Sequence, residues 1–181
     1  MHLVRDPLSQ ADGRAPLTGV RVLGVGSPAG DDRVGWLAIE ALLRSDLFAP
    51  PRPERVCALA LDRPGANLVR YLEGAERVFL IDAMRSGSAP GSILRLEGVP
   101  GESSDHALST HGLGVAAALA LARALQALPC ALILYTVEIA ALAPEAGASA
   151  VARRAARAVA RSIREELRQA ASTRTLEQPL L

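Results

Sequence analysis

Carboxylate side chains recur at the points where apolar runs of the sequence end. Asp31 and Asp32 follow the first such run, Asp62 follows the second, Asp82 follows the third, and Glu138 lies near the end of the last. The carboxyl ends of parallel strands meet at one edge of a sheet, where α/β proteins place their sites. We therefore expect these carboxylates to approach one another and to favour a cation.

His111 adds an imidazole to this set. It falls in the first turn of an expected Ala-rich helix, where the helix dipole disfavours the imidazolium and leaves the ring neutral. Asp32, Asp82 and His111 together would form a ligand set with open positions that suits Zn, Ni, Mn or Fe. Nucleophilic catalysis is less favoured, because no serine lies in a G-x-S-x-G elbow and neither cysteine has a histidine nearby in the sequence.

Each of these residues also has a purely structural interpretation. Asp31 is equally suited to be the N-cap of the following helix, and Asp32 could stabilise the dipole of that helix. Asp62 could close a turn, and His111 could be a capping or packing histidine. For Glu138 we expect an ion pair with a nearby arginine.

The acidic turn itself resembles a phosphate-binding loop in form only. Gly24-Val-Gly26-Ser-Pro-Ala29 fits the G-x-G-x-x-G/A pattern between a strand and a helix. A pyrophosphate needs exposed N–H groups at a helix N-terminus, whereas here two aspartates occupy that position and Pro28 removes one N–H group. The turn therefore favours a cation over a nucleotide.

Apolar runs alternate with helical patterns along the chain, which predicts a three-layer α/β/α sandwich with a mostly parallel sheet of about five strands. The expected strands are Val20–Val25, Val56–Leu61, Arg77–Ile81, Ser92–Leu96, which is short and at an edge, and Ala131–Ile139. The expected helices are Val34–Leu43, Ala66–Leu72, an Ala-rich helix capped by Ser109 or Thr110 that runs to about Leu128, and a last helix capped by Ser149 that runs to about Ala170. We divide the chain into an N-terminal arm (1–18), one domain (19–170) and a C-terminal tail (171–181).

Composition limits the possible partners. The chain has 181 residues and a net charge of +1, which argues against electrostatic binding to nucleic acid or to a membrane surface. Cys57 and Cys130 both lie in apolar runs and are expected to be buried free thiols in a reducing compartment. Since the N-terminus also lacks an apolar signal segment, we expect a cytoplasmic protein.

Three motifs occur in a distinctive order. The acidic turn spans residues 26–35, Ile81-Asp82-Ala83 ends the central strand, and Ser109-Thr110-His111 opens the next helix. Over about residues 20–168 this arrangement resembles the maturation endopeptidases of nickel–iron hydrogenases. Ser27 stands where that family has asparagine, and Arg33 stands where it commonly has glycine.

The resemblance implies a specific activity. Members of the family cleave a C-terminal extension from the hydrogenase large-subunit precursor once nickel is loaded, so the precursor is the expected partner. Asp32, Asp82 and His111 match the residues that contact this nickel, which belongs to the substrate, and no permanent cofactor is expected. Asp62, or Asp32 itself, could activate water. The alternatives are a metal-dependent small-molecule hydrolase with its own ion, and an assembly chaperone that senses nickel without cutting.

Overall fold

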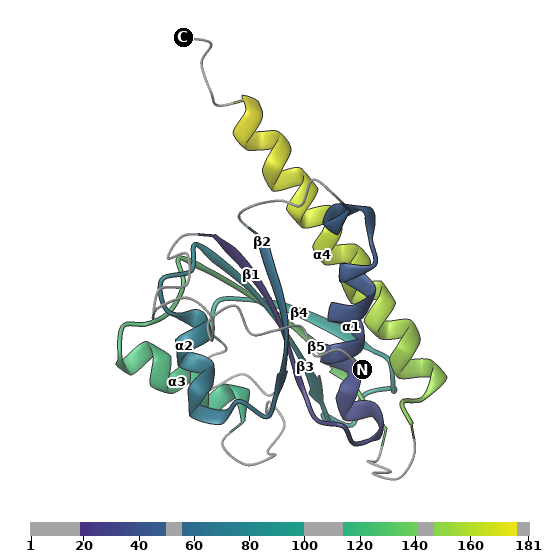
Figure 1. The fold of residues 1–181 in the computed structure, drawn as a ribbon. Coiled ribbons are helices and arrows are strands. Elements are labelled where there is room, and N and C mark those ends of the chain that lie inside the picture. Colours follow the sequence, from purple (N-terminus) through teal and green to yellow (C-terminus); the bar gives the residue numbers. More distant parts are fainter. Residues whose placement is uncertain (1–18, 50–55, 100–113, 141–146, 177–181) are drawn as a thin grey trace.

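A computed structural model describes residues 19–49, 56–99, 114–140 and 147–176. Its centre is a five-stranded sheet in the order β2-β1-β3-β5-β4 (Figure 1). Four strands run parallel, and β4 pairs antiparallel with β5 at one edge. The strands are β1 (Val20–Gly26), β2 (Val56–Asp62), β3 (Arg77–Met84), β4 (Ile93–Glu97) and β5 (Ala131–Glu138).

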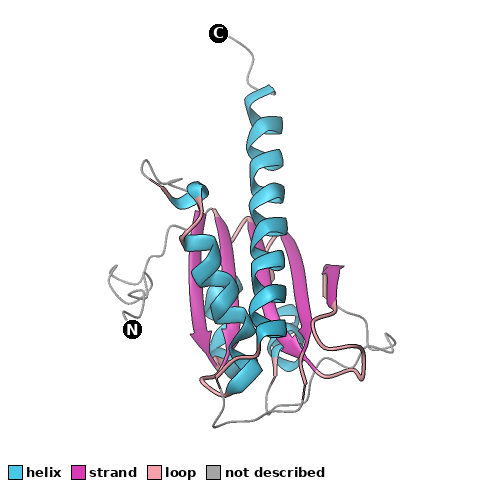
Figure 2. Cartoon of the chain, turned by 90° about the vertical axis from the view of Figure 1, so that its right-hand side faces the viewer, coloured by secondary structure: helices cyan, strands magenta, loops and turns pink. Residues whose placement is uncertain are grey.

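Helices cover both faces of the sheet, which confirms the predicted three-layer arrangement. One face carries α1 (Val34–Leu43) and α4 (Ala150–Leu176), and the other carries α2 (Leu68–Leu72) and α3 (Val115–Ala124) (Figure 1). The C-terminal part of α4 extends past the end of the sheet (Figure 2). Within the described ranges, no helix is long and apolar enough to cross a membrane.

Successive side chains of each strand point to opposite faces of the sheet, so the hydrophobic core has two parts. Val22 and Phe79 pack with α1 and α4, whereas Leu23 and Leu80, the next residues along the same strands, pack with α2 and α3. All four are fully buried. Because successive side chains of a strand point to opposite faces, a central strand covered on both sides must be apolar at every position. The continuous apolar runs of the sequence have this origin.

Two element boundaries differ from the predictions. β3 continues through Asp82 to Met84, because its pairing with β5 extends to the partners Met84 and Glu138. The Ala-rich helix ends at Ala124 instead of Leu128, and its predicted cap at residues 109–110 lies outside the described residues.

The early end of α3 has a local cause at Gln126. This residue has a positive φ of 55°, a conformation that ends helices. The N–H of Ala127 donates to the carbonyl of Ala122 at 2.8 Å, and that of Gln126 donates to the carbonyl of Arg123 at 3.1 Å. These are the two hydrogen bonds of a Schellman motif. Glycine is the usual residue at this position. Because glutamine stands there instead, no residue type marks the end of the helix.

The last helix begins where predicted and ends later. The hydroxyl of Ser149 accepts a hydrogen bond from the N–H of Ala152 at 3.1 Å, which confirms Ser149 as the N-cap of α4. The helix then continues to Leu176 rather than ending near Ala170.

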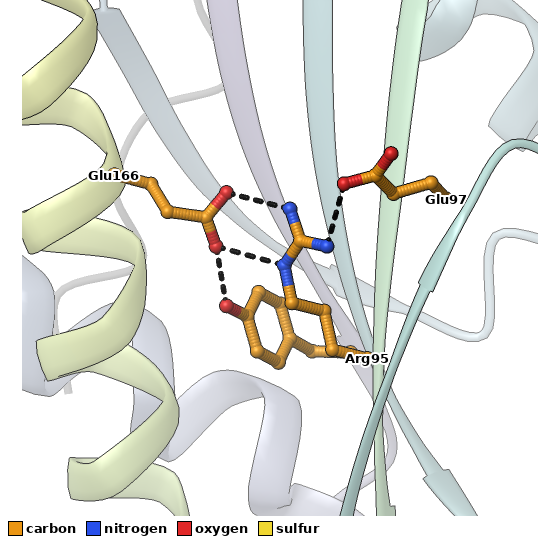
Figure 3. A network of polar contacts seen from close by, with 4 residues as sticks. Arg95, Glu97 and Glu166 are labelled. Carbon is orange, nitrogen blue, oxygen red and sulfur yellow. Dashed lines mark hydrogen bonds and ion pairs between the residues drawn. The ribbon is translucent and has the colours of Figure 1, made fainter.

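A polar network joins α4 to the edge of the sheet (Figure 3). The guanidinium of Arg95 on β4 donates to both carboxylate oxygens of Glu166 on α4, at 3.0 and 2.9 Å. Arg95 also donates to Glu97 at 2.7 Å, and the Tyr135 hydroxyl donates to Glu166 at 2.5 Å. Burial, together with the hydrogen bond to Glu166, raises the pKa of Tyr135 to about 12.

Candidate functional site

The strand order reverses at the carboxyl end of β1. This strand lies between β2 and β3, so the chain leaves β1 toward one side and later returns on the other. Ligands of open α/β sheets bind at such reversals of strand order. Asp32 lies in the 3-10 turn Gly30–Arg33 that follows β1, and Asp82 lies in β3. The two aspartates thus lie after β1 and near the end of the neighbouring strand β3.

Two glycines let the acidic turn pack directly against the end of β1. A Cβ atom on Gly24 would lie 2.2 Å from the carbonyl oxygen of Gly35, and one on Gly26 would lie 2.2 Å from that of Asp32. Real Cβ atoms do not approach backbone oxygens this closely. These glycines therefore serve close backbone contact, which holds Asp32 at the sheet edge.

Asp32 and Asp82 influence each other electrostatically. Burial raises the pKa of Asp82 to about 7; a hydrogen bond from the backbone N–H of Ala83 lowers it, and the charge of Asp32 raises it further. Two carboxylates in one partly buried site cannot both carry a negative charge without cost. A proton or a metal cation relieves this repulsion, so the pair is suited to either. The charge of Asp32 thus acts on Asp82 at this edge of the sheet, and the role of the two residues as metal ligands stays a prediction.

Asp62 reaches the same edge but already has a partner. It is the last residue of β2 and lies opposite Gly26 of β1 in the parallel register. Its carboxylate accepts hydrogen bonds from Arg63, with Nε at 2.7 Å and Nη2 at 3.3 Å. The hydrogen bond to Asp62 raises the pKa of Arg63. Asp62 is therefore an exposed carboxylate that is paired with Arg63.

Asp31 does not cap α1, contrary to one of its predicted interpretations. No side chain caps that helix, and its N-cap residue is Arg33. The carboxylate of Asp31 instead accepts hydrogen bonds from the backbone N–H of Ser149 at 2.5 Å and from its hydroxyl at 2.9 Å. Asp31 thereby fixes the acidic turn to the beginning of α4.

Among the described residues, Glu138 has no arginine as an ion-pair partner, contrary to the expectation. Its side chain is buried and accepts hydrogen bonds from the backbone N–H groups of Ser86 and Gly87 and from the Ser86 hydroxyl, all between 2.8 and 3.0 Å. Burial would raise the pKa of Glu138, but the hydrogen bonds outweigh it and the pKa is lowered. Glu138 thus fixes the chain that leaves β3.

His111 lies outside the described residues. Among the residues that are described, no group of three or more histidine, cysteine, aspartate or glutamate side chains is placed to hold a metal ion. The described part of the predicted metal site therefore consists of the pair Asp32 and Asp82.

The two cysteine side chains are less buried than predicted. Cys57 and Cys130 form no disulfide, but Cys57 is only partly buried and Cys130 is exposed rather than buried. The reason is that Cys130 precedes the first residue of β5, so it does not enter the core.

Three residues at this edge of the sheet were not predicted to matter. The indole Nε1 of Trp36 donates to the carbonyl of Leu61 at 3.0 Å and connects α1 with the end of β2. The hydroxyl of Ser27 accepts a hydrogen bond from the N–H of Ala29 at 3.4 Å. Thr136 is fully buried, and its hydroxyl has no hydrogen-bond partner among the described residues. Burying an unpartnered hydroxyl costs about 1–3 kcal/mol.

A family model described as "Hydrogenase maturation protease" matches residues 53–166. This range is more than half of the chain. The chain belongs to the hydrogenase maturation protease family. It is therefore a peptidase, and the predicted resemblance is confirmed. The matched range includes Asp62, Asp82 and His111 and begins after Asp32.

Solved structures of hydrogenase maturation proteases share this fold. The maturating endopeptidase HybD from Escherichia coli has 23% identity and a TM-score of 0.65, over 84% of this chain and 93% of its own. The [NiFe] hydrogenase maturation protease HycI from Thermococcus kodakarensis has 19% identity and a TM-score of 0.64, over 83% and 92%. The hydrogenase 2 maturation peptidase from a Thaumarchaeota archaeon has 25% identity and a TM-score of 0.61, over 82% and 97%. No curated protein sequence matches the chain.

Proposed function

We propose that this chain removes the C-terminal extension of a hydrogenase large-subunit precursor that has been loaded with nickel. Membership of the hydrogenase maturation protease family supports the peptidase activity and the kind of substrate. The observation that carries the location of the site is the placement of Asp32 and Asp82 at the carboxyl ends of the neighbouring strands β1 and β3, where the charge of Asp32 acts on Asp82. Membership of the family does not identify the residues that act in the reaction. We assign them from the position of Asp32 and Asp82 and from the effect of one charge on the other.

Nickel enters this scheme with the precursor. Asp32, Asp82 and His111 are assigned as the residues that contact it, since carboxylate and imidazole groups are suitable ligands for nickel. The coupling of the two carboxylates supports the assignment, because a cation removes their repulsion. A metal that arrives with the substrate leaves no need for a permanent cofactor.

Asp32 is the favoured group for activation of water, which gives the reaction an aspartic-type character. A general base must reach the water molecule with a free lone pair. Asp62 was an equal candidate from the sequence, but Arg63 holds its carboxylate in an exposed ion pair with two hydrogen bonds, which limits its freedom to turn toward a water molecule. Both residues lie at the same edge of the sheet, so substitution of each can separate the two assignments.

We place the reaction in the cytoplasm. Cys57 and Cys130 are not joined in a disulfide, and the thiol of Cys130 is exposed. Exposed thiols persist where the environment is reducing, as it is in the cytoplasm.

The test uses the purified chain with a nickel-loaded large-subunit precursor, and with the same precursor without nickel as the control. Mass spectrometry of the large subunit measures removal of the extension. We expect the mass to fall only for the loaded precursor. Asp32→Asn, Asp82→Asn and His111→Ala should lower the rate of processing by at least about 100-fold, whereas Asp62→Asn should retain most of it.

Other outcomes identify the alternative functions. An unchanged mass for a loaded precursor that another protease of this family can process would indicate a nickel-sensing chaperone. A metal ion that stays bound to the purified chain without precursor would indicate a metal-dependent small-molecule hydrolase. Loss of activity in Asp62→Asn, with activity retained in Asp32→Asn, would assign the base to Asp62.

A further inference from the structure

Thr136 occupies a special position relative to Asp82. The two residues are direct partners in the parallel register of β3 and β5. Leu80 and Leu134 precede them by two positions and both belong to the core beneath α2 and α3. Since side chains alternate along strands, Asp82 and Thr136 project from this same face. Paired strands lie about 4.8 Å apart, so the two side chains are neighbours.

The Thr136 hydroxyl is not explained by the contacts of the residues that the structure describes. Thr136 is fully buried, yet its Oγ1 atom has no hydrogen-bond partner among the described residues. Valine would fill the same volume without burying a polar atom, and buried polar groups in folded proteins are nearly always paired. An unpaired buried hydroxyl beside a reactive carboxylate indicates a hydrogen bond that forms in another state of the site.

We propose that Thr136 is a positioning residue for Asp82: its hydroxyl donates a hydrogen bond that fixes the orientation of the Asp82 carboxylate when the precursor is bound. This inference rests on the proposed function of Asp82. An ionised carboxylate only accepts hydrogen bonds and has more than one acceptor site. The bond from the Ala83 N–H to Asp82 therefore leaves room for a second donor. Carboxylates that contact a metal are themselves held by such bonds, and loss of one typically costs 10- to 100-fold in activity or affinity.

Two substitutions at one position test the inference. Thr136→Val keeps the shape and removes the hydroxyl, whereas Thr136→Ser keeps the hydroxyl and serves as the matched control. We expect Thr136→Val to lower kcat about 10- to 100-fold with the nickel-loaded precursor. Its melting temperature without precursor should equal or exceed that of the wild type, because the buried hydroxyl has no partner there. Thr136→Ser should process within about threefold of the wild-type rate.

A double-mutant cycle with Asp82→Asn separates this inference from the proposed function. If Thr136 acts through Asp82, then adding Thr136→Val to Asp82→Asn should cause no further loss of rate. Normal processing by Asp82→Asn alone would overturn the proposed function. An inactive Asp82→Asn together with a fully active Thr136→Val would overturn only the role of Thr136. Equal losses of rate in Thr136→Val and Thr136→Ser, with a lower melting temperature in both, would also overturn it by showing a packing role.

Discussion

Asp31, in the turn that follows β1, accepts two hydrogen bonds from Ser149, the residue that caps α4. The two residues are 118 positions apart in the sequence. The neighbour of Asp31 is Asp32, which we assign to the reaction. The C-terminal helix therefore helps to hold the turn that carries the site, although α4 contributes no residue to the proposed chemistry.

Removal of the Asp31 carboxylate should loosen this connection. Asp31→Ala leaves the N–H and the hydroxyl of Ser149 without their acceptor, so we expect it to lower the free energy of unfolding by about 1–3 kcal/mol. Urea denaturation measures this change. Ser149→Ala removes one of the two hydrogen bonds. The double variant should lose less free energy of unfolding than the two single variants lose together. Strictly additive losses would show that the two residues do not act together.

Gly24 should not tolerate a side chain. In Gly24→Ala the added Cβ would lie 2.2 Å from the carbonyl oxygen of Gly35 and 2.7 Å from Cγ1 of Ile39, so the turn and α1 must move. We expect a loss of at least about 1–3 kcal/mol in the free energy of unfolding, together with reduced processing. Gly147→Ala is the matched control, since no atom lies within 4 Å of its added Cβ, and its effect should stay within about 0.5 kcal/mol. A Gly24→Ala variant as stable as this control would contradict the packing.

Asp82 should make the stability of the metal-free protein depend on pH. Burial raises its pKa from the ordinary value of 3.8 to about 7. A raised pKa in the folded state means that stability is fully present below pH 4 and is lost as the pH rises toward 7. Asp82→Asn removes this loss, so it should exceed the wild type at pH 8 by up to about 4 kcal/mol in free energy of unfolding.

Urea denaturation of both proteins between pH 4.5 and pH 8 provides the comparison. The difference between Asp82→Asn and the wild type should grow with pH up to about 7 and then level off. Other titrating groups are common to both proteins and cancel in the difference. A difference that stays constant across the window would mean that Asp82 keeps an ordinary pKa.

Glu166 should stabilise the attachment of α4 to the edge of the sheet. Glu166→Ala removes the acceptor of Arg95 and of the Tyr135 hydroxyl (Figure 3). The side chain of Arg95 is 37% exposed, so solvent weakens its ion pair with Glu166. We therefore expect Glu166→Ala to lower the free energy of unfolding by about 1–2 kcal/mol. Glu165→Ala, at an exposed position of the same helix, should change stability by less than about 0.5 kcal/mol. Equal thermal shifts in the two variants would argue against the network.

Much of the fold follows from local patterns in the sequence. The strands of the sheet centre are continuous apolar runs because helices cover both faces, and Ser149 marks the start of α4 through ordinary capping chemistry. The ends of β3 and α3 were predicted wrongly, because they do not depend on the local pattern of apolar residues. The end of β3 is set by its partner β5, and the end of α3 is set by Gln126 in a conformation usually adopted by glycine.

The placement of Asp32 and Asp82 at one edge of the sheet was predictable, whereas the contacts that hold this edge together were not; the role of the two residues in a reaction stays a prediction. Asp32 and Asp82 could be brought together from the sequence because strand ends meet at one edge of a parallel sheet. The roles of Asp31 and Glu138 could not, since their partners Ser149 and Ser86 are distant in sequence and carry no charge. Thr136 was missed for a related reason: its importance depends on the register between β3 and β5, which no pattern within either strand reveals.

The strand order also means that β4 is synthesised before the strand with which it pairs. β4 lies at the edge of the sheet and pairs with β5, which is made about 40 residues later. At ordinary translation speeds, β4 leaves the ribosome some seconds before its partner strand exists. Arg95 and Glu97 alternate with apolar residues in β4, and charges on an unpaired strand discourage contact with other unpaired strands. Arg95, which attaches α4 in the folded protein, is thus one of the two charges that β4 carries before its partner strand is made.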